Sequence, residues 1–319
     1  MAAPGLRILL VGRQSWLVFL IASAAVFAAV RINGGTLYGV RGVELIAVDT
    51  ATGKSETVFK IVPARLRSQR PPLGMRVAAI DIENQILFLE TYGLDLRPGS
   101  MWLFTYDLRR HLFRPTAFHA SKTTDYFYDP VMRSLYIFLA DGGQILRVDW
   151  QSGSTELVVN LPCSSMVFGT FDPIAGLAYV RLPELLCGIG GPTGEFLNEE
   201  LFIVNIRTSQ VTPTAFRTNL VLEYVADSTT RSLLAVVTKS FLSPQDELLE
   251  VDSSNGLTHS VGVLPQSLRV ADFDRTGRRL YLRTWIKSTT VYELDLGSFD
   301  LRPIGFATNY DIASWAYSP

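Results

Sequence analysis

The sequence predicts an all-β ring of repeated sheets, and three observations lead to that prediction. A two-part phrase recurs along the chain, its spacing is typical of propeller blades, and the chain ends on a half phrase that fits the half missing at its start. The second part of the phrase is a hydrophobic strand ending in Asp or Asn, a short turn and another strand. Its six copies span 45–59, 103–118, 145–159, 201–216, 248–264 and 291–306.

The turn positions set the length of each module. They are Asp49, Asp107, Asp149, Asn205, Asp252 and Asp295, which lie about 49 residues apart on average. Asp and Asn side chains accept hydrogen bonds from the backbone two residues on, which starts a turn between two strands rich in β-branched and aromatic residues.

The first part of the phrase is a similar hairpin that precedes every copy except the first, at 79–90, 128–138, 171–180, 226–237 and 273–283. Each module therefore has four strands. Such a sheet cannot bury both faces alone, so neighbouring modules must stack in a closed ring. Residues 309–319 match a first half and then stop. We therefore expect a six-bladed β-propeller of four-stranded antiparallel blades, closed by the C-terminal strand joining the first blade.

Several of these phrases have a recognisable form. The pattern of three hydrophobic residues, Val-Asp, three residues and Gly occurs at 45–53 and, with Arg147 at its third position, at 145–153; FDRTGRRLYL spans 273–282, and the chain ends on WAYSP. Over roughly residues 37 to 319 the chain resembles the six-bladed β-propeller superfamily, with similarity to its TolB-like and its YVTN or quinoprotein-type repeats. The resemblance implies the fold and no activity, because that superfamily contains enzymes, receptor domains and scaffolds.

Composition agrees with one large domain. With 48% hydrophobic residues and a net charge of −1, the chain can bury a sizeable core and has no overall bias toward nucleic acid. Of the three histidines, His111, His119 and His259, the first and the last lie in short turns of different predicted blades, so no zinc cluster or histidine-based triad is expected.

The N-terminus carries a separate signal. Arg7 and Arg13 precede the uncharged stretch 14–30, which we expect to form a hydrophobic helix. Its length suits either a cleaved signal peptide or an uncleaved signal anchor. Residues 1–31 are thus assigned to that segment and 32–319 to the propeller. Either alternative places the propeller in the secretory pathway, lumenal or extracellular, and the second adds a membrane anchor with a cytoplasmic N-terminus.

The two cysteines bear on the compartment. Cys163 and Cys187 lie at equal distances from the turn at 172–176, so they are near cross-strand neighbours. A disulfide is plausible in an oxidising compartment, and two buried free thiols are the alternative.

Loop lengths indicate which face binds a ligand. The turns within hairpins are short, whereas the long insertions, 61–76, 91–102, 182–200 and 238–247, all fall in connections that reach the opposite face of the ring. Ligand-binding candidates there are Arg65, Arg67, Arg70 and Arg76, with Trp102 and Glu195. The arginines would bind an anion or an acidic partner. A solvated loop, and a tryptophan that only covers the core, are the alternatives.

A possible metal site lies on the inner strands. Asp125, Glu223, Asp272 and Asn309 occupy positions four or two residues before a turn residue, so their oxygens could line the centre of the ring. Hard oxygen ligands suit calcium. Six-bladed lactonase-type propellers hold calcium at such a place, so the resemblance implies a calcium-dependent lactonase or esterase as the alternative function. Ordinary polar lining with water is the simpler interpretation.

The sequence as a whole favours a non-catalytic binding propeller, secreted or membrane-anchored, with an unknown protein or small molecule bound on the long-loop face. It predicts no cofactor, with calcium as the one exception weighed, and no nucleic-acid partner.

Overall fold

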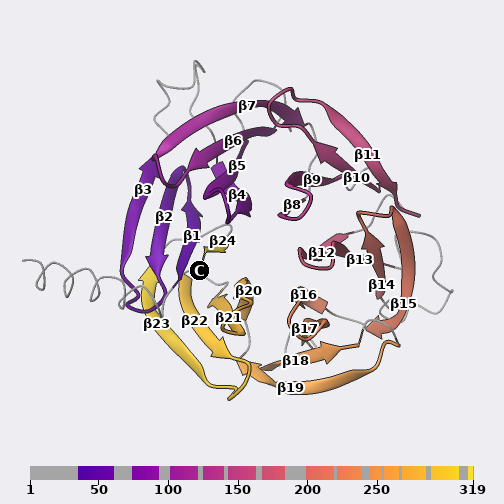
Figure 1. Cartoon of the computed structure of the whole chain (residues 1–319). Helices are drawn as coiled ribbons and strands as arrows, with labels where there is room; N and C mark the ends of the chain where they lie inside the picture. The colour runs from indigo at the N-terminus through magenta and orange to yellow at the C-terminus, as the bar shows by residue number, and fades with distance from the viewer. Residues whose placement is uncertain are drawn as a thin grey trace, which may run out of the picture.

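The protein folds into six four-stranded antiparallel sheets arranged around a common axis, a six-bladed β-propeller (Figure 1). The computed structural model describes residues 35–60, 74–92, 101–120, 125–139, 143–162, 167–183, 199–218, 221–238, 245–252, 255–265, 268–284, 289–308 and 315–318. We number the blades 1 to 6 in the order in which the chain forms them.

In each of the first three blades, the first strand named below lies nearest the axis and the fourth lies on the outside (Figure 1). Blade 1 contains β24 (Trp315–Ser318), β1 (Thr36–Arg41), β2 (Glu44–Asp49) and β3 (Ser55–Lys60). Blade 2 contains β4 (Gly74–Asp81), β5 (Ile86–Tyr92), β6 (Met101–Asp107) and β7 (Leu112–Ala120). Blade 3 contains β8 (Asp125–Asp129), β9 (Ser134–Leu139), β10 (Gln144–Val148) and β11 (Thr155–Asn160).

The remaining blades repeat that order. Blade 4 contains β12 (Val167–Asp172), β13 (Leu177–Pro183), β14 (Glu199–Asn205) and β15 (Gln210–Thr218). Blade 5 contains β16 (Val221–Asp227), β17 (Ser232–Thr238), β18 (Gln245–Val251) and β19 (Thr258–Pro265). Blade 6 contains β20 (Leu268–Asp274), β21 (Arg279–Thr284), β22 (Thr289–Asp295) and β23 (Leu301–Thr308).

The predicted closure of the ring is confirmed. Strand β24 pairs antiparallel with β1, with Thr36 opposite Ser318 and Gly39 opposite Trp315. The C-terminal strand thus supplies the inner edge of blade 1, and its backbone hydrogen bonds join the two ends of the propeller.

One turn geometry explains the recurring Asp. In both kinds of hairpin, the Asp or Asn accepts hydrogen bonds from backbone N–H groups two and three residues later, as Asp149 does from Gln151 and Ser152. The fifth residue then has a positive φ, which is +78° at Gly153 and +49° at Arg133. An Asp followed four residues later by Gly therefore favours this turn through local interactions alone.

The core lies between blades. Phe127 of β8 stacks on Phe168 and Phe171 of β12, with ring centroids 5.2 Å and 4.5 Å apart, and similar clusters fill the other interfaces. Burial of each such side chain stabilises the fold by about 1.5–3 kcal/mol, so stacking of whole blades supplies most of the cohesion.

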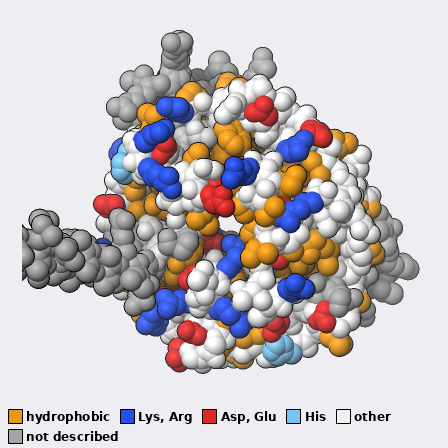
Figure 2. All heavy atoms as spheres, in the orientation of Figure 1, with side chains coloured by type: hydrophobic (Ala, Val, Ile, Leu, Met, Phe, Trp, Pro, Cys, Tyr) orange, Lys and Arg blue, Asp and Glu red, His pale blue; other side chains and the backbone are white. Residues whose placement is uncertain are grey.

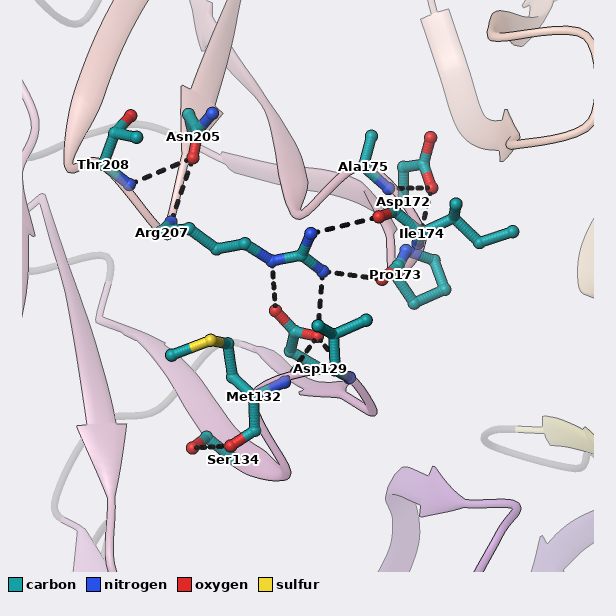
Figure 3. A network of polar contacts seen from close by, with 11 residues as sticks. Asp129, Met132, Ser134, Asp172, Pro173, Ile174, Ala175, Asn205, Arg207 and Thr208 are labelled. Carbon is teal, nitrogen blue, oxygen red and sulfur yellow. Dashed lines mark hydrogen bonds and ion pairs between the residues drawn. The ribbon is translucent and has the colours of Figure 1, made fainter.

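Near the axis, first-hairpin aspartates link five of the six pairs of neighbouring blades in the described part of the chain. Asp129 of blade 3 accepts hydrogen bonds from the Arg207 guanidinium of blade 4 at 3.0 Å and 3.1 Å (Figure 3). Asp172 accepts from Ser228 of blade 5 at 2.6 Å, and Asp227 from Arg278 of blade 6 at 3.1 Å.

Tyrosines make the other two links. Tyr128 of blade 3 donates to Asp81 of blade 2, and Tyr317 of β24 donates to Asp274 of blade 6. Burial, together with these hydrogen bonds, raises the pKa of both tyrosines. We call the five aspartates, Asp81, Asp129, Asp172, Asp227 and Asp274, the inner aspartates.

The two faces of the ring differ as expected. Turns inside the hairpins lie on one face, the short-turn face, and the other connections lie on the opposite, long-connection face. The segments 61–73, 93–100, 184–198 and 239–244 all belong to the latter class, but they lie outside the described residues. So do the N-terminal segment up to residue 34, Cys163 and Cys187. In the part of the chain that is described, no helix is long and apolar enough to cross a membrane.

All four predicted insertions are too long by a few residues, because the flanking strands extend into 61–76, 91–102, 182–200 and 238–247. Two candidate site residues are affected. Arg76 was expected in the insertion 61–76, but it lies in β4 opposite Glu90. Trp102 was expected in the insertion 91–102, but it lies in β6 opposite His119. Both loops are shorter than the sequence suggested because β4 and β6 pair with β5 from Gly74 and Met101 onward.

Candidate functional site at the centre of the ring

Charged side chains gather where the inner strands begin and the second strands end, at the long-connection end of the axis. We call this set the axial cluster: Arg76, Glu90, Asp125, Arg181, Glu223, Arg269 and Arg283. They come from blades 2 to 6. All except Glu90 keep some solvent exposure, so water reaches the cluster.

Blade 2 supplies a tightly packed ion pair. The Arg76 guanidinium donates to Glu90, whose carboxylate is almost fully buried. The Tyr126 hydroxyl of blade 3 donates to the other oxygen of Glu90 at 2.7 Å, and the Arg76 guanidinium lies 5.8 Å from the Tyr126 ring centroid. The charges of Arg76 and Glu90 thus offset each other, and the hydrogen bonds to both oxygens of Glu90 hold the pair in one position.

Asp125 lies near the Arg76–Glu90 ion pair. Burial raises its pKa to about 6, while the nearby Arg76 opposes the shift and Glu90 adds to it. Arg181 of blade 4 also lowers the pKa, so this guanidinium lies within electrostatic reach of Asp125. Arg181 is positioned by a hydrogen bond from its Nη1 to the Val221 carbonyl of blade 5, at 2.7 Å.

Glu223 occupies the corresponding level in blade 5. Its carboxylate accepts the Val270 backbone N–H of blade 6, and burial raises its pKa to about 7. Arg283, Arg269 and Arg181 oppose that shift, in that order. Arg181 therefore lies between two titratable carboxyl groups, Asp125 on one side and Glu223 on the other.

This arrangement suits binding better than bond cleavage. The cluster contains four guanidinium groups, and a guanidinium can form paired hydrogen bonds with a carboxylate or phosphate. Arg76 is paired with Glu90, and Arg269 lies 3.9 Å from the buried Asp246. Burial raises the pKa of Asp125 to about 6 and that of Glu223 to about 7. When these two carboxyls are protonated, the cluster becomes more positive, which favours an anionic group.

The predicted metal residues are only partly brought together. Asp125 and Glu223 both lie four residues before their turn aspartates, at one level, whereas Asp272 lies two residues before Asp274 and thus about 7 Å nearer the short-turn face. The Asp272 oxygens accept the backbone N–H groups of Phe273 and Tyr317. Within the described residues, no three His, Cys, Asp or Glu side chains are grouped as a metal site requires. Asn309 lies outside those residues, and the calcium prediction stays untested.

The predicted ligand-binding residues have mixed outcomes. Arg65, Arg67, Arg70 and Glu195 lie outside the described residues. Arg76 belongs to the axial cluster. Trp102 stacks on His119 with centroids 5.2 Å apart and packs against the core between blades 1 and 2, so the described contacts of its ring are with the protein itself.

Sequence reasoning missed Arg181 and Arg283, although a signal was present. Blades 4 and 6 share Tyr, a hydrophobic residue and Arg at 179–181 and 281–283. The strand registers place Glu90, Arg181 and Arg283 at equivalent positions on the second strands. A charge at the end of three equivalent strands points to the axis, which only the ring topology reveals.

With the fold and this cluster described, the chain can be compared with known proteins. No family model matches the sequence, and no curated protein does. Among solved structures, a chain of the nidogen/laminin complex is similar, with a TM-score of 0.62 and 11% identity over 90% of this chain and 99% of that one. TolB from Acinetobacter baumannii is similar with a TM-score of 0.62 and 12% identity, over 94% of this chain and 71% of that one. At these identities, the similarities show a shared fold alone, in agreement with the six-bladed β-propeller described above.

Proposed function

We propose that the protein is a non-catalytic binding propeller that accepts an anionic group of its ligand at the axial cluster, from the long-connection face. The observation that carries the proposal is the placement of Arg181, which lies between Asp125 and Glu223 and within one cluster with Arg76, Arg269 and Arg283. A carboxylate or phosphate would bind these guanidinium groups while the two titratable carboxyls take up protons.

Two further features support a binding role. The arginines come from the ends of regular strands, and the ion pair of Arg76 with Glu90 in blade 2 and the hydrogen bond of Arg181 to Val221 of blade 5 fix their positions. A rigid set of donors loses little conformational entropy when a ligand binds. A similar fold occurs in a complex of nidogen and laminin, so a propeller of this kind is compatible with a protein partner.

The compartment is part of the proposal. The hydrophobic stretch 14–30, with Arg7 and Arg13 before it, supports entry into the secretory pathway, either secreted or anchored in a membrane. A protease-protection assay on membrane fractions would test this placement. Complete digestion of the propeller without detergent would contradict a lumenal location.

The binding proposal is tested with citrate and inorganic phosphate as probes and the neutral triamide of citric acid as the control. We expect thermal unfolding of the full chain to shift upward with the anions and not with the amide. The shift should grow as the pH falls from about 8 to about 5, because protonation of Glu223 and Asp125 removes competing negative charge.

Arg181→Gln is the deciding variant, and Arg114→Gln on the exposed outer strand β7 is its matched control. We expect the first to weaken anion binding at least about tenfold and the second to leave it unchanged. The proposal is wrong if neither anion stabilises the protein at any of these pH values, or if both variants bind as the unaltered chain does.

A further inference from the structure

Among the described residues near the axis, the most exposed apolar side chains of the short-turn face lie on blades 3 and 4, whereas Ile82 in the equivalent turn of blade 2 is 39% exposed. Val131 and Met132 lie in the β8–β9 turn and are 64% and 44% exposed, and Ile174 in the β12–β13 turn is 64% exposed. Pro130 and Pro173 precede them. We call these five residues the apolar patch. Figure 2, which looks onto this face, shows hydrophobic side chains gathered to the right of the centre, over these blades.

The equivalent turns of blades 5 and 6 show that the fold does not require an apolar patch. Their tips read Ser228, Thr229, Thr230 and Arg275, Thr276, Gly277. All these turns have the same Asp-initiated geometry. The apolar residues of blades 3 and 4 therefore contribute nothing to turn formation that Ser and Thr do not, although exposing them to water is unfavourable.

The patch is rigid because a network of hydrogen bonds around Arg207 holds its two turns in place. Arg207 donates to both oxygens of Asp129 and also to the Ile174 and Pro173 carbonyls, at 3.1 Å and 3.0 Å (Figure 3). Asp129 in turn accepts the N–H groups of Val131 and Met132. One arginine thus fixes the turns of two blades relative to each other, and a fixed apolar surface binds with a small entropic cost.

Positive charge surrounds the patch. Arg133 follows Met132, Arg231 ends the corresponding turn of blade 5, and blade 2 contributes Arg109 and Arg110, all four exposed. The exposed acids in the described turns of blades 2, 3 and 5 are Glu83, Asp149 and Asp252, and Glu156 on strand β11 of blade 3 is exposed but paired with Arg147. Asp149 already accepts hydrogen bonds from Gln151 and Ser152, and Asp252 accepts one from Asn255. The buried Asp129 and Asp227 are paired with Arg207 and Arg278, so these ion pairs add no net charge.

A hollow adjoins the patch on its outer side. It has a volume of about 470 Å³ and runs from Arg133 and Ser134 to Trp150 and Gln151. Aromatic and arginine side chains are the residue types that most often dominate the energetics of protein interfaces.

We propose that the apolar patch is a second docking surface, which binds an extended acidic and apolar segment of a partner protein on the face opposite the axial cluster. The apolar side chains of the segment cover Val131, Met132 and Ile174, and its carboxylates pair with Arg133, Arg231 and Arg109. Charge complementarity selects this occupant over a basic segment or a second copy of the chain, since two copies would bring the same arginines together.

Three fluorescent synthetic peptides of equal length test the proposal against the full chain. The first alternates Glu with Leu and Phe, the second has Lys in place of Glu, and the third has Ser in place of Leu and Phe. We expect measurable binding of the first peptide only, weakened by salt. Ile174→Asp should weaken it at least about tenfold. Leu257→Asp, also in an exposed turn of the same face but on blade 5, should leave binding unchanged.

Other outcomes overturn the proposal. Equal binding of the first two peptides, no binding of the first, or equal loss in both variants would each do so. Sedimentation of the unaltered chain and of Ile174→Asp covers the remaining occupant: self-association that Ile174→Asp abolishes would assign the patch to a second copy. Matching unfolding midpoints for the two variants would confirm that folding is not the cause of any difference.

Discussion

Two rings of aspartates lie on the short-turn face, and they show how one local motif has two roles. The inner aspartates and the outer ones, such as Asp49 and Asp149, accept the same backbone N–H groups two and three residues later. The inner ones are buried and receive another hydrogen bond from the next blade, whereas Asp49 and Asp149 are exposed and bond only within their own turn. Position in the ring, and not the turn sequence, decides which carboxylate joins two blades.

The largest expected effect comes from removing an inner carboxylate. Asp129→Ala would leave the Arg207 charge half-buried without its partner and would lose the acceptor for Val131 and Met132. We expect a loss of about 3–5 kcal/mol in the free energy of unfolding. Asp149→Ala loses only turn hydrogen bonds of an exposed carboxylate and should therefore cost much less than Asp129→Ala. Urea denaturation monitored by tryptophan fluorescence measures both losses. Equal losses would contradict the inference that only the inner aspartate joins two blades.

Substitution by Asn separates the two roles of an inner aspartate, which are to close its own turn and to bind the next blade. Asn closes the same turn at Asn205, where its oxygen accepts from Arg207 and Thr208. We therefore expect Asp149→Asn to be close to neutral. Asp129→Asn should still cost about 2 kcal/mol, because the charge-assisted bond to Arg207 is lost while the turn remains. The same denaturation experiment would contradict this if Asp129→Asn were neutral too.

A smaller effect is expected at the closure of the ring. Tyr317→Phe removes the hydrogen bond to Asp274 but keeps the ring contact with Tyr281, whose centroid is 5.1 Å away. We expect a loss of about 1 kcal/mol. Tyr292→Phe, in β22 of blade 6, is a control that removes a hydroxyl outside the inner ring. An equal effect of the two substitutions on the unfolding midpoint would show that the inner link at Asp274 has no special weight.

The pH dependence of stability distinguishes axial carboxyls from turn carboxylates. Burial raises the pKa of Glu223 to about 7 from an ordinary value of 4.5, so its contribution to stability is full below pH 4.5 and is lost as the pH rises through 7. Hydrogen bonds from Ser152 and the backbone lower the pKa of Asp149, so its contribution is lost as the pH falls below 3.8. Glu223→Gln should therefore flatten the decline of the unfolding midpoint between about pH 5 and about pH 8 by a few degrees. Asp149→Asn should leave that slope unchanged, and a slope insensitive to Glu223→Gln would contradict the assigned burial.

The smallest expected effect concerns calcium. Both oxygens of Asp272 already accept backbone N–H groups, and one oxygen of Glu223 does, so we expect no shift of the unfolding midpoint on adding calcium or a chelator. A shift of several degrees that disappears in Asp125→Ala would instead support the calcium-dependent hydrolase that the sequence offered as the alternative.

The sequence by itself determined the blades, because their signals are local. Asp or Asn followed by a positive-φ residue four positions later closes each turn, and apolar strands flank it, so strand number, blade number and the role of residues 315–318 could all be predicted. Asp125 and Glu223 were also found, because counting from a turn aspartate gives a residue's level along an inner strand.

Only the tertiary structure decided which charges meet. Arg181 lies 40 residues from Val221 and Arg207 lies 78 residues from Asp129, and no periodicity within one blade relates them. Their contacts arise because ring closure brings one face of each blade against the next. For the same reason, the outward position of Val131, Met132 and Ile174 was not predicted. In a sequence, a hydrophobic residue beside a strand suggests a core position. The folded turns instead expose these three side chains to solvent.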